Sequence, residues 1–365
     1  MKVIHIFGEL KPSGGEAMML SAAPMWLSVA EMHILSTGDE SVGVYAEKLS
    51  KAGYVIHHIP FRKSVSFFID LVRLLRKEKY DVVHMHTQRA SLWFALISRL
   101  ALGSSANLIR TVHHIFKFDG WLRSRIKIER YLVRSLLNVT LISNSPSGKK
   151  NELIRYGSDN RLIPNWYDSA FYVPPTDTQR AKIRYVLGYN EDTCIFLSLG
   201  GNWYYKNYGM IVEALALLPT DINILYVQVG VQGEGMPLET TALHLGVAER
   251  LRCMGVVDDP RMYLQAADVY MMPSSEEGFG VAAVEAMACG LPAILSDVEA
   301  LCDFRENIPG IEYINPNPQE IANAMVKLAQ LSVTERKRLG YFIANATKQN
   351  YGLECGAKSY LQLYQ

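Results

Sequence analysis

The chain has 365 residues, a length that predicts two domains, and its net charge at pH 7 is +1. Its content of 49% hydrophobic and 20% charged residues excludes a disordered chain, and no run of about 18 apolar residues predicts a membrane-spanning helix. The N-terminal MKVIHIF lacks the apolar stretch of a secretory signal, and the scattered cysteines indicate a reducing compartment, so we expect a cytoplasmic protein.

The first half of the chain alternates between predicted strands and predicted helices. Helices are expected from about residue 16, before Gly53, over 66–79 and over 90–102. Strands are expected at 2–7, before Pro60, and at 81–86, 107–115, 139–145 and 162–168. This alternation predicts a parallel sheet that is covered by helices on both faces.

The same pattern restarts after a predicted linker at 169–180, which contains Pro174 and Pro175. Strands are expected at 194–200, 222–230, 251–257, 268–274 and 292–296, with helices from about residue 208, near 238–246 and before Gly290. The chain is therefore predicted to form two α/β domains. Ligands of such sheets bind beyond the carboxyl ends of the strands, often in a cleft between domains.

Charge is unevenly distributed along the chain. Residues 1–170 contain 23 Lys and Arg against 14 Asp and Glu, whereas the remaining residues carry a net charge of −8. The basic segments 62–79 and 116–134 favour contact with an anionic membrane or acceptor through Arg62, Lys63, Lys117, Trp121, Arg123, Arg125 and Lys127. The alternative is a solvated basic helix face. No nucleic-acid motif accompanies the charge, so nucleic acid is not an expected partner.

The segment 271–297 is the most informative for function. A strand ends at Pro273, and Gly278 and Gly280 precede a helix that begins near Val281. Free N–H groups at a helix start attract phosphate. Glu277 lies before this start and Glu285 lies about 6 Å further along the helix axis. The pattern predicts a nucleotide-diphosphate sugar with its diphosphate at the helix start, although either glutamate alone is typical of an ordinary surface position.

These two glutamates, together with the Glu-Ala-Met-Ala-Cys-Gly-Leu-Pro that begins at Glu285, resemble the retaining family 4 glycosyltransferases, also called glycosyl transferases group 1. Looser similarities follow in the family's order at 14–16, 81–86, 111–113, 163–168, 253–256 and 351–364. The resemblance implies an α/β GT-B fold, in which two Rossmann-like domains face each other across a cleft. The implied parts are an acceptor-binding domain at 1–170, a nucleotide-sugar-binding domain at 171–348, and a helix at 349–365 that packs back on the first domain.

The resemblance also implies roles for individual residues. Glu277 would hold hydroxyls of the transferred sugar and Glu285 would hold the ribose. His113 would lie near the sugar, where it would donate a hydrogen bond or assist the leaving phosphate, although the alternative is a buried structural histidine. The remaining donor-binding residues implied are Gly15, Asn202, Lys206, Gly255, Val256, Phe279, Gly280 and Val281, of which Lys206 would neutralise the leaving diphosphate and the last three would offer backbone N–H groups.

One departure from the family pattern concerns the cation after the first strand of the second domain. The family usually has an arginine where this chain has Gly201 or Asn202, which leaves Lys206 as the matching cation. Arg89 or Arg110 could substitute for it, or turnover could be slow. A metal site built from His84, His86, His113 and His114 fits by residue type, but no carboxylate or cysteine completes it. Neither a metal nor another cofactor is therefore expected.

The resulting functional hypothesis is a retaining, metal-independent glycosyltransferase of lipopolysaccharide or capsule biosynthesis. Its donor would be a UDP-sugar or, second, GDP-mannose, and its acceptor a lipid-linked sugar or polysaccharide at the inner face of the cytoplasmic membrane. Two alternatives remain open: a nucleotide-sugar epimerase of the same fold, and a non-catalytic nucleotide-sugar-binding relative. The sequence leaves the donor base, the sugar, the linkage and the oligomeric state undefined.

Overall fold

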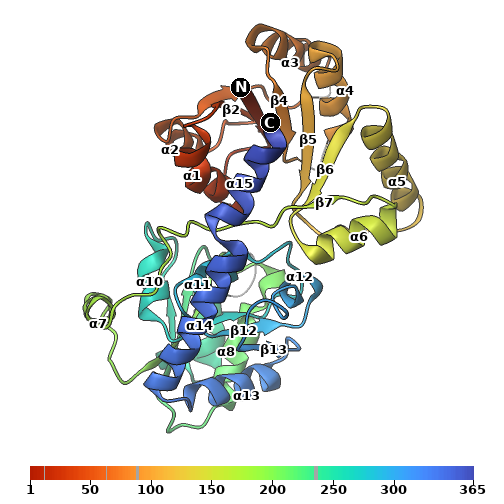
Figure 1. Cartoon of the computed structure of the whole chain (residues 1–365). Coiled ribbons are helices and arrows are strands. Elements are labelled where there is room, and N and C mark those ends of the chain that lie inside the picture. Colours follow the sequence, from red (N-terminus) through yellow and green to blue (C-terminus); the bar gives the residue numbers. More distant parts are fainter. Residues whose placement is uncertain (12, 63, 88–89, 234–236) are drawn as a thin grey trace. The chain divides into compact units, whose positions relative to one another are not determined.

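A computed structural model describes the whole chain except residues 12, 63, 88–89 and 234–236 (Figure 1). The described residues form two compact units, of which the first comprises Met1–Tyr167 with Leu353–Gln365 and the second comprises Asp168–Gly352. Each unit is built around one parallel sheet. The sequence places the domain boundaries after 170 and 348, whereas the units divide after Tyr167 and Gly352.

The first unit contains a seven-stranded sheet in the order β3-β2-β1-β4-β5-β6-β7. Its strands are β1 (Lys2–Phe7), β2 (Glu31–Ser36), β3 (Val55–His58), β4 (Val82–Met85), β5 (Asn107–Val112), β6 (Val139–Ser143) and β7 (Arg161–Leu162). Its helices are α1 (Gly14–Trp26), α2 (Ala46–Lys51), α3 (Val65–Glu78), α4 (Ser91–Leu102), α5 (Gly120–Ser135), α6 (Pro146–Tyr156) and α15 (Leu353–Tyr364).

Alternation along β1 explains how helices cover both faces of this sheet. Val3 and Phe7 pack in a core with residues of α1, α2 and α15. Ile4 and Ile6 point to the opposite face and pack with residues of α3 and α4. Successive side chains of a strand point to opposite faces, so an apolar strand such as KVIHIF supplies both cores.

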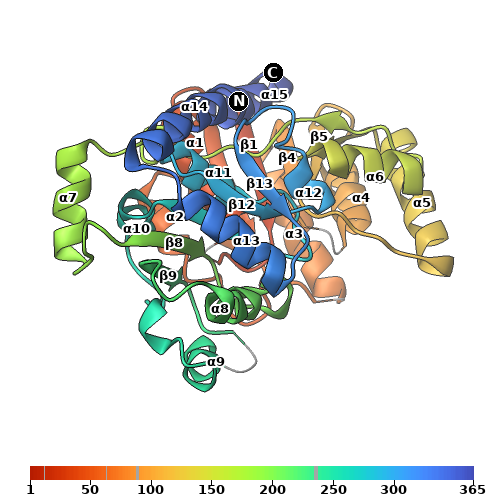
Figure 2. The same cartoon turned by 90° about the horizontal axis from the view of Figure 1, so that it is seen from below.

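The second unit contains a six-stranded sheet in the order β10-β9-β8-β11-β12-β13. Its strands are β8 (Cys194–Leu199), β9 (Ile224–Val229), β10 (Leu251–Cys253), β11 (Val269–Met272), β12 (Ala293–Ser296) and β13 (Ile311–Ile314). Its helices are α7 (Asp177–Val186), α8 (Tyr208–Leu217), α9 (Leu238–His244), α10 (Pro260–Ala266), α11 (Val281–Ala288), α12 (Glu299–Cys302), α13 (Pro318–Ala329) and α14 (Val333–Tyr351). Figure 2 shows α13 beside β12 and β13.

The strand order of the second sheet reverses between β8 and β11. From β8 the chain runs outward through β9 to β10, and from β11 it runs outward in the other direction through β12 to β13. Loops that follow two strands on either side of such a reversal diverge and leave room for a ligand between them. The loops after β8 and β11 contain Lys206 and Glu277.

Several element boundaries differ from the sequence predictions. The strands β2 and β13 are absent from the predicted set, and the predicted linker at 169–180 already contains the start of α7 at Asp177. The closing helix predicted over 349–365 begins only at Leu353, because α14 continues to Tyr351. Among the described residues, no helix is both long and apolar enough to cross a membrane.

The last helix belongs structurally to the first unit. The Trp26 indole N–H donates a hydrogen bond to the Ala357 carbonyl at 2.9 Å, and the Asn107 amide donates to the Leu363 carbonyl at 2.9 Å. Gly356 lies so close to Trp166 that a Cβ there would come within 2.2 Å of the indole ring. A glycine is therefore needed for α15 to approach Trp166 this closely.

Candidate functional site

The loop after β8 approaches the loop after β9 backbone to backbone. Gly230 has a φ of +139°, and a Cβ at this position would lie 2.2 Å from the Gly200 carbonyl oxygen. The Asn202 N–H donates to the Val231 carbonyl, and a Cβ on Gly233 would lie 2.0 Å from the Asn202 carbonyl oxygen. These glycines let the two loops pack tightly, which fixes the backbone that leads to Lys206.

Lys206 and Glu277 form an ion pair at the strand-order reversal. The Lys206 ammonium donates to a Glu277 carboxylate oxygen at 2.6 Å, and both side chains are largely buried. The Ser274 hydroxyl donates to the same oxygen at 2.9 Å. The structure therefore brings together two residues that are 71 positions apart in the sequence and that the sequence analysis assigned to donor binding.

The loops that carry this pair are linked by hydrogen bonds. The Ser275 N–H donates to the Tyr205 carbonyl at 2.8 Å, and the Asn207 amide donates to the Pro273 carbonyl at 2.9 Å. The Ser296 hydroxyl at the end of β12 donates to the Ser274 carbonyl. Such hydrogen bonds hold the ligand-contacting side chains of a site in place before the ligand binds.

Helix α11 starts beside this pair at Gly280, which adopts a left-handed conformation with a φ of +90°. The Phe279 side chain is buried and packs edge-to-face against Phe304 and Tyr351, so only its backbone faces the loop. The first N–H groups of a helix have no acceptor within the helix, and the helix dipole favours negative charge there. The start of α11 is therefore suited to an anion, and binding of the diphosphate by the N–H groups of Phe279, Gly280 and Val281 stays a prediction.

Glu285 lies one helical turn further along α11. Burial raises the pKa of its carboxyl to about 8, while a hydrogen bond with Tyr172 opposes the shift and the charge of Asp168 adds to it. Tyr172 belongs to the segment that the sequence predicted as a linker, so the analysis of the sequence missed this partner. A half-buried carboxyl with few partners is suited to accepting hydrogen bonds from hydroxyl groups of a ligand, such as those of a ribose.

We predict that Glu285→Gln stabilises the fold at pH 8 but not at pH 4. The folded-state pKa of about 8 lies above the ordinary value of 4.5. The unfolded carboxyl therefore releases its proton first, and the stability contributed by this group is lost as the pH rises from about 4.5 to 8. Removing the charge should raise the free energy of unfolding at pH 8 by roughly 2–4 kcal/mol. Thermal unfolding at both pH values measures the effect.

The exposed neighbour Glu276 provides the matched control, since Glu276→Gln should leave the melting temperature unchanged at both pH values. If Glu285→Gln raised the free energy of unfolding equally at pH 4 and pH 8, this would contradict the conclusion that burial raises the pKa of Glu285.

Gly255 and Val256 lie beyond β10, at the same edge of the sheet. Gly255 adopts a φ of +67°, and its carbonyl accepts from the Gly230 N–H at 2.8 Å. Val256 is 76% exposed and Met254 is 37% exposed. An apolar, solvent-facing surface follows the strand here, as expected for residues over which a nucleotide base could lie.

One of the two arginines considered as replacements for the missing family arginine, Arg110, is among the described residues. Arg110 on β5 is fully buried, and its guanidinium lies 3.6 Å from the Glu129 carboxylate. A buried side chain of this kind cannot reach a diphosphate in solvent, so this suggestion is wrong. Arg89 lies outside the described residues.

The first unit contains the other two predicted donor-site residues, Gly15 and His113. Gly15 is in the first turn of α1, where the Ser13 hydroxyl accepts its N–H at 3.3 Å. His113 follows β5, and Asn144 donates to its carbonyl at 3.2 Å. Both residues line a cavity of about 10 Å³, together with His84, His86 and Trp166. The predicted site residues thus form two groups, one in each unit.

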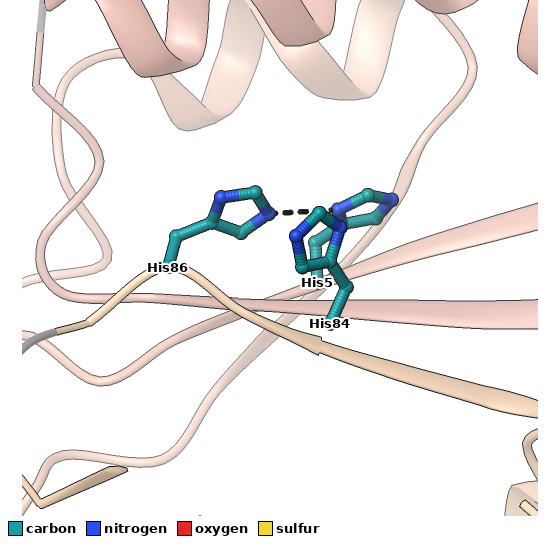
Figure 3. Close-up of side chains that lie close together, drawn as sticks. All are labelled: His5, His84 and His86. Atoms are coloured by element: carbon teal, nitrogen blue, oxygen red, sulfur yellow. Dashed lines mark hydrogen bonds between the residues drawn. The ribbon is translucent and has the colours of Figure 1, made fainter. Parts of the chain in front are cut away.

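A buried histidine cluster lies on the face of this sheet that α1 and α15 cover. His5 on β1 is in register with His84 on β4, and His86 follows two residues later on the same side (Figure 3). Nitrogens of these three rings lie within 4.8 Å of one another, which is a spacing that a metal ion could bridge. The sequence prediction of no metal stays a prediction.

The nitrogens of this cluster are, however, largely engaged with protein groups. His84 bonds to the Tyr364 hydroxyl and to the Thr111 hydroxyl, each at 2.8 Å. His5 Nδ1 and His86 Nε2 bond to each other at 3.0 Å (Figure 3). A metal ion would have to replace these bonds, so the donor set fits a hydrogen-bonded cluster better than an ion.

The basic surface predicted from the sequence centres on α5. Trp121, Ile128 and Tyr131 are 76%, 59% and 65% exposed, and the Arg125 guanidinium lies 5.9 Å from the Trp121 ring. Arg62, Lys117, Arg123 and Lys127 are also exposed, whereas Lys63 lies outside the described residues. The sequence analysis missed exposed apolar residues on the neighbouring helices α3 and α4, which include Val65 and Trp93.

Comparison with known proteins identifies the family. Residues 179–349 match the family described as Glycosyl transferases group 1, and residues 31–171 match Glycosyltransferase Family 4. The chain belongs to the family 4 glycosyltransferases. The family predicted from the two glutamates and their surroundings is thus confirmed, and this glycosyltransferase has the two parallel-sheet, Rossmann-like domains expected of the GT-B fold.

Relatives of this glycosyltransferase include a galactosyltransferase of Escherichia coli, UDP-Gal:alpha-D-GlcNAc-diphosphoundecaprenol alpha-1,3-galactosyltransferase. It is 26% identical over 288 residues, which cover 74% of this chain and 72% of the relative. The capsular polysaccharide biosynthesis glycosyltransferase CapH of Staphylococcus aureus is 21% identical over 361 residues, which cover 94% of each chain.

Solved structures similar to this glycosyltransferase share its fold at low sequence identity. A glycosyltransferase from Rickettsia africae ESF-5 superposes with a TM-score of 0.85 at 17% identity and covers 100% of this chain and 97% of that one. Anabaena HepE in complex with UDP-glucose superposes with a TM-score of 0.82 at 18% identity, with 100% and 99% coverage.

Proposed function

We propose that this glycosyltransferase moves a sugar, with retention at the anomeric carbon, from a nucleotide-diphosphate sugar to an acceptor hydroxyl. The observation that carries the proposal is the Lys206–Glu277 ion pair at 2.6 Å, placed at the strand-order reversal beside the start of α11. This arrangement offers a cation and free helix N–H groups to a diphosphate, and a carboxylate to sugar hydroxyls.

The chemistry requires stabilisation of charge on the leaving diphosphate. When the glycosidic bond breaks, the negative charge of the diphosphate grows, and the Lys206 ammonium and the N–H groups at Gly280 and Val281 would lower the energy of that state. An oxygen of the leaving diphosphate then accepts the proton of the incoming hydroxyl on the same face. Glu277, released from Lys206 when the diphosphate binds, would orient the sugar hydroxyls.

A UDP-sugar is the favoured donor, with GDP-mannose second. A relative from Escherichia coli carries UDP-Gal in its name, and HepE of the same fold binds UDP and UDP-glucose. The base would lie against the loop at Met254–Val256, and Glu285 would accept the ribose hydroxyls. Donor affinity should then increase as the pH rises towards 8, because the ionised carboxylate is the better acceptor.

No divalent metal is assigned to this reaction, since Lys206 and the start of α11 supply the positive charge. We therefore expect full activity in the presence of EDTA. A loss of activity in EDTA that added Mg²⁺ or Mn²⁺ restores would contradict this assignment.

The acceptor would be a lipid-linked sugar or a growing polysaccharide at the inner face of the cytoplasmic membrane. Support comes from the exposed aromatic and basic side chains of α5, since rings suit the headgroup layer and cations suit lipid phosphates. The relatives named for diphosphoundecaprenol and for capsular polysaccharide agree with such an acceptor.

Binding to vesicles tests the membrane proposal. Sedimentation should recover more protein with vesicles containing 30% phosphatidylglycerol, about a tenth of this with neutral vesicles, and little with the variant Trp121→Ser/Arg125→Ser. Tyr341→Ser/Lys337→Ser, which removes an exposed ring and an exposed cation from α14 in the other unit, serves as the matched control. Equal binding to both kinds of vesicle would contradict the proposal that the protein binds an anionic membrane.

Product analysis by mass spectrometry tests the transferase reaction itself. Incubation with UDP-sugars and an undecaprenyl-diphosphate-linked sugar should yield an acceptor that is heavier by one sugar, and NMR of the new linkage should show the donor's anomeric configuration. An isomerised donor without transfer would indicate the epimerase, and binding without turnover would indicate the non-catalytic relative.

A further inference from the structure

The histidine cluster of the first unit continues as a hydrogen-bonded chain to His113. His86 bonds through Nε2 to His5 Nδ1 and through Nδ1 to His113 Nε2, each at 3.0 Å. Figure 3 shows the hydrogen bond between the His5 and His86 rings; His5 lies on β1, and His86 directly follows β4. His86 therefore links the fully buried His5 to the residue expected near the sugar.

The three rings are neutral, because burial lowers the pKa of His5 to about 3, that of His113 to about 4, and that of His86 well below its usual range. A neutral imidazole carries one proton, so one of its nitrogens donates and the other accepts. His86 must then donate to one neighbour and accept from the other. The hydrogen bonds among His5, His86 and His113 therefore have only two arrangements, in which the donors point in opposite directions.

The surroundings of His5 Nε2 distinguish these two arrangements. His5 is fully buried, and none of the described residues offers a hydrogen-bond partner to its Nε2. If His86 donated to His5, the His5 proton would be at Nε2 as a buried N–H without an acceptor. If His5 donates to His86, only a lone pair is left unsatisfied at Nε2. Orphaned buried N–H groups are the rarer of the two in proteins, so the protons run from His5 to His86 to His113.

We propose that His5 and His86 are positioning residues that fix His113 as its Nδ1–H tautomer, so that His113 donates a hydrogen bond to the sugar and does not act as a general base. In this arrangement His113 accepts at Nε2 from His86 Nδ1–H, and its own proton is on the nitrogen that His86 does not contact. The role at the sugar rests on the proposed function, whereas the tautomer follows from the hydrogen bonds of the first unit alone.

The packing around the chain holds these rings in place. His5 stacks on Trp26 with ring centroids 5.3 Å apart and an angle of 9° between the planes. Phe7 stacks on His86 with centroids 4.2 Å apart. These stacking contacts fix the planes of the His5 and His86 rings, and the hydrogen bonds between the three histidines fix which ring edge faces which neighbour.

Nitrogen-15 NMR of the full chain, labelled at histidine and free of ligands at pH 7.5, tests the proposal. His113, assigned through its loss in His113→Gln, should show a protonated Nδ1 and an unprotonated Nε2. His86→Leu should shift His113 to mainly the Nε2–H tautomer and lower kcat about tenfold with a smaller change in KM. His86→Asn should restore both, because the asparagine amide nitrogen occupies the position of Nδ1.

The second histidine pair of this unit provides the control. His33 and His57 bond at 2.8 Å between β2 and β3, and His57→Leu should change neither the His113 tautomer nor kcat. An Nε2–H tautomer of His113 in the unaltered protein would overturn the proposal. So would stoichiometric binding of Co²⁺ that perturbs His5, His84 and His86, because the cluster would then be a metal site.

The same measurement separates this proposal from the proposed function. If His113 shows the Nδ1–H tautomer but no nucleotide sugar is turned over, the transferase proposal fails and the hydrogen-bond arrangement stands. If transfer occurs with the Nε2–H tautomer, the arrangement fails alone.

Discussion

Lys206→Met should lower kcat/KM for sugar transfer by about 10²–10³. The reason is that the ammonium would stabilise charge that appears on the diphosphate as the bond breaks, and this chain has no arginine at Gly201 or Asn202 to share that task. Steady-state kinetics with the donor identified by product analysis measures the loss. It should fall mainly on kcat, since the charge is greatest in the transition state.

A double-mutant cycle distinguishes this catalytic role from a structural one. If Lys206 served only to neutralise Glu277, Lys206→Met/Glu277→Gln would recover activity, because the unpaired buried charge would be gone. If both side chains contact the donor, kcat/KM of the double variant should be no higher than that of the less active single variant. Lys327→Met is the matched control, since Lys327 forms a 2.6 Å pair with Glu312 on the surface of the same unit. A kcat/KM within threefold of the unaltered protein for Lys206→Met would contradict the assignment.

The second large effect is acid destabilisation of the first unit. Burial lowers the pKa of His5, His84, His86 and His113 below the ordinary value of 6.5. As the pH falls through 6.5, these histidines gain protons in the unfolded chain but stay neutral in the folded one, so stability is lost towards about pH 4. Four such groups give a slope of at most about 5 kcal/mol per pH unit, which is comparable with the whole stability of a domain.

Urea unfolding followed by tryptophan fluorescence at pH 7.5, 6.5 and 5.5 measures this slope. The urea midpoint should fall steeply below pH 6.5. His5→Phe keeps a ring against Trp26 and lowers by about one the number of protons that the protein takes up on unfolding, so the fall should be less steep. His244 is exposed on α9 in the other unit, and His244→Gln should leave the slope unchanged. A urea midpoint that is constant from pH 7.5 to 5.5 would show that the cluster is not held neutral.

Local signals explain which parts of the molecule could be predicted from the sequence. The start of α11 is encoded by adjacent residues, since Gly280 permits the left-handed turn and the apolar run after it forms the helix. The apolar strands β1, β4, β8 and β11 are similarly local, and the alternation of strands and helices predicts the two parallel sheets. Strand β2 was missed because EMHILS follows α1 closely, without strong turn residues to separate the two elements.

Non-local pairing explains what could not be predicted. Alternation along β4 puts His84 and His86 on one face, but His5 joins them only because β1 and β4 are neighbours in register. Tyr172 is adjacent in sequence to turn residues and gave no signal of its contact with Glu285. Arg110 was proposed for the donor site from its charge alone. It is buried beside Glu129, and the charge of a residue in the sequence does not reveal whether its side chain can reach a ligand.

A crystal structure of the protein with UDP or an unhydrolysed UDP-sugar tests the central claim most directly. We predict that the diphosphate lies at the N-terminus of α11, within hydrogen-bond distance of the Gly280 or Val281 N–H and of the Lys206 ammonium, with the ribose on Glu285. A nucleotide bound elsewhere, such as in the 240 Å³ cavity beside Pro174 and Arg336, would contradict the account.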